Sequence, residues 1–209
     1  MATVDMPPPK VGRDGELMTL AEFRQLPDDG VERELLGGVV RVISEEEQMT
    51  RRSKRHCGSM SRVDQALLNW LDRDENATGC VMSGELGVDL PIVNLAVGSD
   101  VAYFRGDLLP EGFPDDSDNP YLELAPTLAV EILSPSDKHG DVLNRVAQYL
   151  MAGTEAVWLI DPVGKTVTSY ADDRPPRMTS GEQPLTEPEV LPGFEIDVSQ
   201  LFRFVIRKP

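Results

Sequence analysis

Two short apolar runs, at residues 127–133 and 156–160, constrain the fold of this chain more than any other feature. Each run ends at a proline-containing pair, and each is predicted to be a central strand covered on both faces. Between them, residues 141–152 carry apolar side chains at helical spacing, and Gly153 follows as a helix stop. Strand, helix and strand in this order predict one crossover unit of a mixed sheet.

The rest of the sequence predicts further short strands and helices. Thr19 and Glu22 form a capping-box pattern, which predicts a helix at residues 20–25. Gly37 and Gly38 separate two β-like runs and predict a hairpin, because a tight turn there needs positive φ angles. An amphipathic helix is predicted from the spacing of Met60, Val63, Leu67, Trp70 and Leu71. Strands are also predicted at residues 80–83, 87–90, 99–104, 165–170 and 191–197, a polar loop at 172–188, and a short helix at 198–204.

These elements predict an α/β or α+β fold, with a mixed central sheet flanked by helices and an N-terminal helix and β-hairpin. With 209 residues, the chain is expected to form one domain at 16–206 after a proline-rich, disordered tail at 1–15. No apolar run approaches the roughly 18 residues of a membrane span, and no secretory signal opens the sequence. A cytoplasmic protein without a membrane partner is therefore expected.

The charge balance is unusual for a protein that contacts nucleic acid. Lys and Arg number 20 and Asp and Glu number 36, which gives a net charge of −16. This composition counts against a general phosphate-binding protein, because such proteins are normally basic. One concentrated basic segment stands out, and it is expected either to face nucleic acid at the mouth of a cleft or to form a solvated loop. Its residues are Arg51, Arg52, Lys54 and Arg55.

Two carboxylates in apolar surroundings are the candidate site residues. Glu131 lies inside the run at 127–133, where an ionised carboxylate is costly unless it is paired or bound to a metal. Asp100 opens the predicted strand at 99–104. Held close together, the two carboxylates would raise each other's pKa unless a cation intervened, and hard oxygen ligands of this kind suit Mg²⁺ or Mn²⁺. The alternatives are an exposed edge-strand Glu131 and a strand-capping Asp100.

Several short motifs follow one another along the chain, each of them once. They are the segments 18–23, 34–38, 130–136, 158–162 and 191–194, together with His56, Asp100, Tyr149 and Gly153. In this combination the sequence resembles the Uma-two family of restriction endonucleases over residues 17–204. The most specific part is Glu-Ile-Leu-Ser-Pro-Ser at 131–136. That family is assigned to the PD-(D/E)XK nuclease fold, so the resemblance implies a restriction-endonuclease-like sheet.

The resemblance also implies roles for individual residues. Asp100 and Glu131 would be the metal ligands, and Glu34 and His56 would line the same pocket. His56 could contact a phosphate, or it could simply make a backbone hydrogen bond at the start of a helix. The implied reaction is hydrolysis of DNA phosphodiester bonds with one or two Mg²⁺ or Mn²⁺ ions, which would activate a water molecule.

The basic residue of the site departs from the family pattern. The position that carries lysine in the family is Arg145 here, and arginine stays protonated and cannot act as a base. Arg145 could still offset negative charge in the transition state. Lys138, in the loop before the helix, is an alternative source of a lysine.

Three functions remain open from the sequence. The first is a metal-dependent endonuclease acting on DNA. The second is a catalytically impaired relative that serves as a nucleic-acid- or protein-binding module. The third is a two-carboxylate hydrolase such as a glycosidase, which the 6% aromatic content disfavours. A homodimer is plausible from the hairpin and the apolar strand edges.

Overall fold

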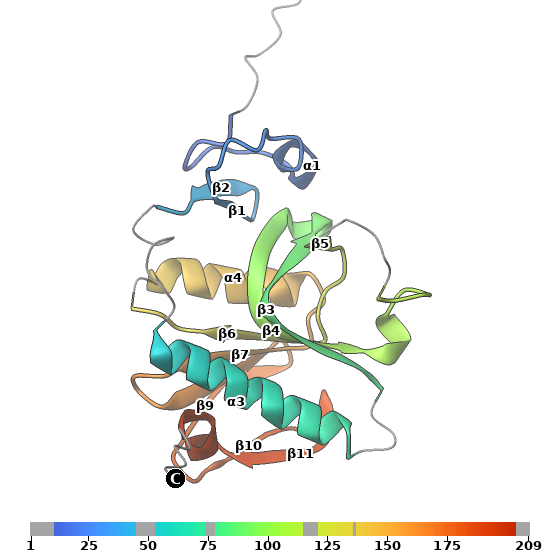
Figure 1. Ribbon diagram of the computed structural model, residues 1–209, viewed down its shortest axis with the longest axis vertical. Coiled ribbons are helices and arrows are strands. Elements are labelled where there is room, and N and C mark those ends of the chain that lie inside the picture. The colour runs from blue at the N-terminus through green and yellow to red at the C-terminus, as the bar shows by residue number, and fades with distance from the viewer. Residues whose placement is uncertain (1–10, 45–52, 74–77, 115–120, 136, 204–209) are drawn as a thin grey trace, which may run out of the picture.

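A nine-stranded sheet forms the centre of the molecule in the computed structural model, which describes residues 11–44, 53–73, 78–114, 121–135 and 137–203. Within these residues the main strand order is β2-β1-β4-β6-β7-β8-β9, and β3 and β5 extend the sheet beside β4 (Figure 1). A separate two-stranded sheet, β10-β11, packs near the C-terminal end. The predicted mixed sheet with flanking helices is confirmed.

The predicted crossover unit lies in the middle of the sheet. β6 (Leu128–Ile132) and β7 (Ala156–Asp161) are parallel neighbours, and α4 (His139–Met151) connects them. Val142, Val146 and Tyr149 are buried along one side of α4, which packs on one face of the sheet. Glu131 is the single charged residue in β6, whose five residues are all buried.

A long hairpin of β3 (Gly79–Leu90) and β4 (Leu95–Arg105) crosses the front of the sheet in Figure 1. A 3₁₀ turn, η1 (Pro91–Val93), joins the two strands, and β4 pairs antiparallel with β6. Asp100 therefore lies in the middle of β4, and the prediction that it opens a strand at residue 99 is wrong. β4 begins earlier because Leu95, Ala96 and Val97 are also buried strand residues. Gly98 separates them from the predicted segment.

The N-terminal part forms one end of the sheet. The capping box at Thr19 is present and starts α1 (Leu20–Phe23). β1 (Arg33–Leu36) and β2 (Val39–Val42) form the predicted hairpin, and β1 joins the main sheet where Leu35 pairs with Ala96 of β4.

The segment 11–15 differs from the predicted tail. The amide of Gly15 donates to the carbonyl of Val40 at 2.8 Å, and Asp14 Oδ1 accepts from the amide of Val42 at 3.0 Å. These residues therefore cover the outer edge of β2, whose backbone groups would otherwise lack protein partners. Residues 1–10 of the predicted tail and 204–206 of the predicted domain lie outside the described residues.

The C-terminal third contains more strands than predicted. β8 (Thr166–Ala171), β11 (Leu191–Asp197) and the 3₁₀ helix η3 (Val198–Phe202) match predicted elements. The predicted polar loop at 172–188 is wrong, because it contains β9 (Arg174–Ser180) and β10 (Pro184–Glu187). β9 is an exposed edge strand with two prolines, so it shows no alternation of apolar and polar residues. Two small elements, η2 (Gly106–Leu108) and β5 (Tyr121–Leu122), lie in the loop after β4.

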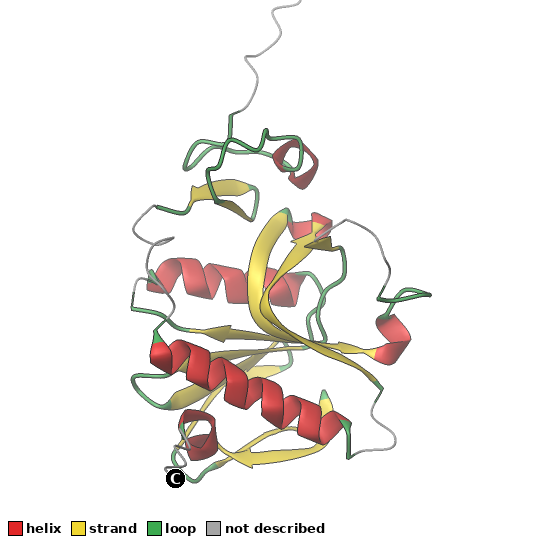
Figure 2. Cartoon of the chain, in the orientation of Figure 1, coloured by secondary structure: helices red, strands yellow, loops and turns green. Residues whose placement is uncertain are grey.

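Helices cover both faces of the sheet (Figure 2). α3 (Lys54–Leu71) packs on one face with Val63, Leu67 and Trp70, against a core that includes Trp158 and Tyr103. α4 covers the other face. Within the described residues, no helix is long and apolar enough to span a membrane. This arrangement places the middle of β4 and the C-terminal end of β6 near the N-terminus of α3 and the middle of α4, where the candidate site lies.

Candidate active site

Glu131 projects from β6 toward α4. Its neighbours Val130 and Ile132 belong to the core on the α3 side, so Glu131 occupies the opposite face, as the alternation predicts. The residue is 5% exposed. Its Oε2 accepts a hydrogen bond from Arg145 Nη1 at 2.8 Å, and its Oε1 accepts one from the Tyr149 hydroxyl at 3.2 Å. The predicted buried strand Glu131 is therefore present, and the edge-strand alternative is wrong.

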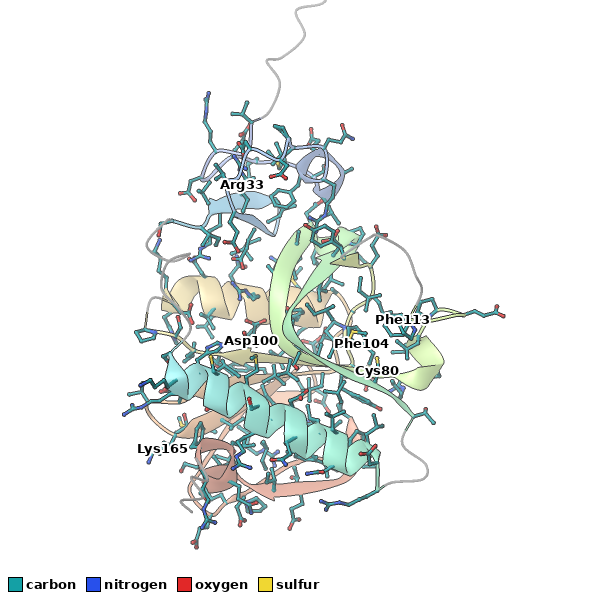
Figure 3. All side chains as sticks on the ribbon, in the orientation of Figure 1. Arg33, Cys80, Asp100, Phe104, Phe113 and Lys165 are labelled. Atoms are coloured by element: carbon teal, nitrogen blue, oxygen red, sulfur yellow. The ribbon has the colours of Figure 1, made fainter. Side chains whose placement is uncertain are left out.

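Asp100 lies on the strand beside Glu131. β4 pairs with β6 in a register that sets Val101 opposite Val130, and the same register continued by one residue sets Asp100 opposite Glu131. Asp100 is 4% exposed, and its Oδ2 accepts a hydrogen bond from the amide of Ile132 at 2.8 Å. Figure 3 shows Asp100 in the middle of the molecule, between the levels of α4 and α3 in that view.

His56 reaches the site from the first turn of α3. The side chain of Ser53 caps this helix by accepting from the amide of His56 at 3.1 Å. The imidazole is fully buried, and its Nε2 lies 3.2 Å from Asp100 Oδ1. The helix start therefore places the ring against the carboxylate, so His56 has both the backbone role and the pocket position considered from the sequence.

Glu34 joins the site from the N-terminal hairpin. Its two oxygens lie 3.2 and 3.1 Å from Arg145 Nη2, and its Oε2 also accepts from Arg41 Nη1 at 3.0 Å. Arg41 is the cross-strand partner of Glu34 in the β1–β2 register. Because Arg145 contacts Glu34 and Glu131 together, it ties the hairpin layer to the central sheet.

Burial dominates the electrostatics of Glu131. It raises the pKa of the carboxyl to about 7; the Arg145 guanidinium opposes this rise, and the charge of Asp100 adds to it. An ion pair at 2.8 Å thus fails to keep this pKa low, because the loss of hydration outweighs the attraction. Burial lowers the pKa of Arg145, but the carboxylates of Glu131 and Glu34 outweigh it and hold that pKa above its ordinary value.

The remaining predicted residues lie farther from these contacts or outside the described chain. Lys138 is exposed at the N-cap of α4, whereas Arg145 makes the contact with Glu131. Lys54 and Arg55 are exposed in the first turn of α3, directly before His56. Arg51 and Arg52 lie outside the described residues.

Two contacting residues were not predicted as part of the site. Arg41 could have been found from the hairpin, since a turn at Gly37 and Gly38 sets residue 34 opposite residue 41. Tyr149 is one of the motif residues in the sequence, but no site role was predicted for it. Its hydroxyl contact with Glu131 depends on the depth at which α4 packs on β6, which the sequence does not state.

The residues at the site fit a hard divalent cation. Asp100 and Glu131 supply carboxylate oxygens from adjacent strands, and their mutual repulsion is one cause of the raised Glu131 pKa. Within the part of the chain that the structure describes, no group of three His, Cys, Asp or Glu side chains is placed to hold a metal. Two carboxylates suffice for Mg²⁺, which commonly keeps several waters and takes further ligands from substrate phosphates.

Comparison with known proteins places the chain in a family. The family model described as "Uma2: Putative restriction endonuclease" matches residues 20–199. No curated protein matches the chain. A solved structure from Anabaena variabilis ATCC 29413, described as "a putative nuclease belonging to DUF820", superimposes with a TM-score of 0.72 and 20% identity, covering 88% of this chain and 97% of that one.

At this level of identity, the solved structure shows that the two proteins share a fold. The family match is independent of that superposition and spans both carboxylate strands, α3 and α4. Its limits also enclose Glu34, His56 and Arg145, so every described residue of the candidate site falls within the matched region. The chain belongs to the Uma2 family of restriction-endonuclease-like proteins.

Proposed function

We propose that this protein is a nuclease that hydrolyses DNA phosphodiester bonds with the help of Mg²⁺ or Mn²⁺. One observation carries the proposal: two buried carboxylates, Asp100 and Glu131, lie on adjacent strands. A histidine contacts Asp100, and an arginine contacts Glu131. The family match supports the same reaction class.

Asp100 and Glu131 are the residues that would hold the metal. When bound, the ion would polarise the scissile phosphate and lower the pKa of an attacking water. The amide of Ile132 and the ring of His56 fix the orientation of Asp100, and the Tyr149 hydroxyl does the same for Glu131. A carboxylate pair held in this way is organised before substrate arrives.

Arg145 contributes positive charge and no proton transfer. Its guanidinium stays protonated, so it would stabilise negative charge that develops on the phosphate. The proton of the attacking water would go to another acceptor. In this respect the site differs from the lysine-containing pattern that the family resemblance implies.

A basic segment would provide the contact with the DNA backbone. Lys54 and Arg55 are exposed at the N-terminus of α3 and directly precede His56, the histidine that contacts Asp100. Helix N-termini attract anions, and here two cationic residues stand in the first turn, at the positive end of α3. Together with Arg51 and Arg52, these residues would bind phosphates next to the site.

A DNA cleavage assay tests the proposal. Supercoiled plasmid is incubated with the wild-type protein and Mg²⁺ or Mn²⁺, with EDTA, and with the variants Asp100→Ala and Glu131→Ala. We expect metal-dependent nicking by the wild type that falls by at least about 100-fold in both variants. Asp107→Ala, which removes an exposed carboxylate paired with Arg105, is the matched control and should retain activity. Equal cleavage by wild type and both site variants would reject the proposal.

A second candidate function is favoured by Arg145 itself. Because arginine cannot act as a base, the protein could bind nucleic acid or another protein at this site without cleaving a bond. The same assay separates the two functions when it is paired with a DNA-binding measurement. Binding by the wild type with no cleavage in either metal would support the binding module.

A further inference from the structure

Arg145 places the two ends of its guanidinium on different carboxylates. Nη1 donates to Glu131 Oε2 at 2.8 Å, whereas Nη2 lies 3.1 and 3.2 Å from the two oxygens of Glu34. The side chain is 16% exposed, so both contacts lie in a largely desolvated region. Among the described residues, Arg145 Nε is buried without a hydrogen-bond partner. One guanidinium thus bridges the buried carboxylate of Glu131 and the partly buried carboxylate of Glu34.

The same guanidinium stands where it would compete with a divalent ion. Glu131 is one of the two residues that would hold the proposed metal, and its Oε2 already accepts a charged hydrogen bond. A divalent ion at Asp100 and Glu131 would repel the guanidinium strongly, because charges at short range in a buried site are poorly screened. Both cations can therefore occupy Glu131 together only at a large cost in free energy.

Glu34 gives Arg145 a second anionic partner. If Nη1 leaves Glu131, Nη2 can keep its contact with Glu34, so the guanidinium does not lose all compensation for its burial. Arg41 Nη1 holds Glu34 from the other side at 3.0 Å, and Arg41 Nε lies 3.5 Å from Asp141 Oδ2 on α4. Glu34 is thereby fixed between two guanidiniums, as a positioning residue for Arg145.

We propose that Arg145 is an internal counter-ion of Glu131 in the metal-free protein, and that a divalent cation displaces it from Glu131 while Glu34 retains it. This inference rests on the proposed metal site at Asp100 and Glu131. After displacement, the Arg145 guanidinium would no longer be paired with Glu131 and would lie next to the metal. Metal binding would therefore both load the site and free the arginine for a substrate phosphate.

Competition of this kind is reciprocal and can be measured without turnover. If metal weakens the Arg145–Glu131 contact, then removing Arg145 must tighten metal binding by a corresponding factor. Binding of Mg²⁺ alone is measured by isothermal titration calorimetry at about pH 8.5, because loss of the guanidinium raises the pKa of Glu131 further and a proton would otherwise compete. We expect Arg145→Gln to bind Mg²⁺ about tenfold more tightly than the wild type.

Two matched variants separate this effect from a general change in charge. Arg145→Lys keeps a cation at the site and should bind Mg²⁺ closer to the wild-type affinity. Arg105→Gln also removes one positive charge, from a guanidinium paired with Asp107 and Glu155 on the surface, and should leave the affinity unchanged. Tightening of equal size in Arg105→Gln would overturn the inference.

The role of Glu34 is tested by a double-mutant cycle. Glu34→Gln should weaken Mg²⁺ binding in the wild-type background, because Arg145 then has only Glu131 as a partner. In the Arg145→Gln background the same change should have a clearly smaller effect. Equal weakening in both backgrounds would mean that Glu34 acts directly on the cation and would overturn its assignment as a positioning residue.

A structural readout on the wild type covers the case in which Arg145→Gln does not fold. In a crystal structure with Mn²⁺ bound, we expect Arg145 Nη1 beyond hydrogen-bond distance from Glu131 Oε2, with Nη2 still on Glu34. An unchanged 2.8 Å contact with metal present would contradict the inference. A different result would refute displacement alone. In it the wild type binds Mg²⁺, Asp100→Ala does not, and Arg145→Gln binds no more tightly than the wild type. Absence of Mg²⁺ binding in all variants would instead refute the proposed metal site.

Discussion

Burial of Glu131 gives the carboxyl group a pKa of about 7, against an ordinary value of 4.5. At a pH between these two pKa values, Glu131 keeps its proton in the folded protein and releases it in the unfolded chain. Stability from this group is therefore fully present below about pH 4.5 and is lost as the pH rises through about 7. The carboxylate that we propose as a metal ligand thus weakens the fold at neutral and higher pH.

The variant Glu131→Gln makes this effect measurable. Glutamine mimics the protonated acid, so urea denaturation should give similar free energies of unfolding for variant and wild type near pH 5. At pH 8 we expect the variant to be more stable, by on the order of 3 kcal/mol. Glu155→Gln, which changes a half-exposed carboxylate, should show no such pH-dependent difference. A variant that stays parallel to wild type across this range would contradict the raised pKa.

At the same scale, the sequence identified the carboxylates better than their partners. Glu131 could be predicted because a lone charge in an apolar strand must be compensated, and Asp100 because its strand has the same apolar character. Arg145 entered through its place in the family pattern. Its contacts with both Glu131 and Glu34 depend on how α4 lies between β1 and β6, which is a property of tertiary packing.

Among the elements, the β1–β2 hairpin matters most to the site because it carries Glu34. Its turn uses Gly37 and Gly38, with φ angles of 59° and 80°. A Cβ on Gly38 would lie 3.3 Å from the carbonyl oxygen of Met18, in a conformation that side chains rarely adopt. The turn therefore requires glycine at this position, and the placement of Glu34 depends on it.

Replacing Gly38 by alanine should lower the free energy of unfolding by about 1–2 kcal/mol, as measured by urea denaturation. The matched control is Gly140→Ala in α4, where φ is not positive and no atom lies within 4 Å of the added Cβ. That change should stabilise the protein by about 0.5–1 kcal/mol, because alanine favours helix. Equal effects at the two positions would argue against a strained turn.

The short strand β10 is attached to the main sheet through one buried carboxylate. Glu187 is fully buried and accepts hydrogen bonds from Trp158 Nε1 at 3.0 Å, from Ser169 Oγ at 2.6 Å and from Arg174. These donors belong to three neighbouring strands, β7, β8 and β9. Removing the acceptor would leave the buried Trp158 and Ser169 donors without this partner and would take away the main counter-charge of Arg174.

Glu187→Ala should therefore destabilise the protein by about 3–5 kcal/mol in thermal or urea unfolding. The exposed Glu189→Ala, two residues along, should change stability by less than about 0.5 kcal/mol. A mild effect of Glu187→Ala would show that the two-stranded sheet is held mainly by apolar packing around Leu185 and Leu191.

The elements that the sequence predicted correctly carry local signals. The capping box at Thr19, the glycine pair of the hairpin and the periodic apolar positions of α3 and α4 all depend on nearby residues. The strands at 174–180 and 184–187 carry no such signal. Most of their residues are polar or proline, and they become strands because β8 and β11 offer hydrogen-bonding partners.

At the scale of the whole molecule, a charge of −16 opposes the approach of DNA. A local basic segment must therefore supply the attraction. Replacing Arg51, Arg52, Lys54 and Arg55 by glutamine should weaken DNA binding and reduce the slope of log affinity against log salt by about 3 to 4. Fluorescence anisotropy over a range of NaCl concentrations measures both quantities.

The control for this variant changes the same number of exposed cations elsewhere. Its four substituted residues are Arg13, Arg73, Lys165 and Arg203. It should retain most of the salt dependence, because none of its charges belongs to the segment that precedes His56. Similar losses in both variants would show that overall charge, and not the segment before His56, governs binding.

The fold class followed from the strand–helix–strand unit, but the arrangement of the sheet did not. β1 pairs with β4, and β4 with β6, across long stretches of chain. Many orders of these strands would bury the same apolar residues, and no local pattern selects among them. The juxtaposition of Glu34, Asp100 and Glu131 is therefore implied by the family resemblance and by no local pattern of the sequence.

That juxtaposition has a consequence for the protein during its synthesis. Glu34 and Arg145, which meet in the site, are 111 residues apart in the chain. A ribosome must release α4 before the arginine can reach the hairpin, and contacts of such long sequence separation form slowly. A nascent chain therefore carries Glu34 long before it carries Arg145, whereas Glu131 precedes Arg145 by only 14 residues. The complete constellation exists only in protein whose translation has passed α4.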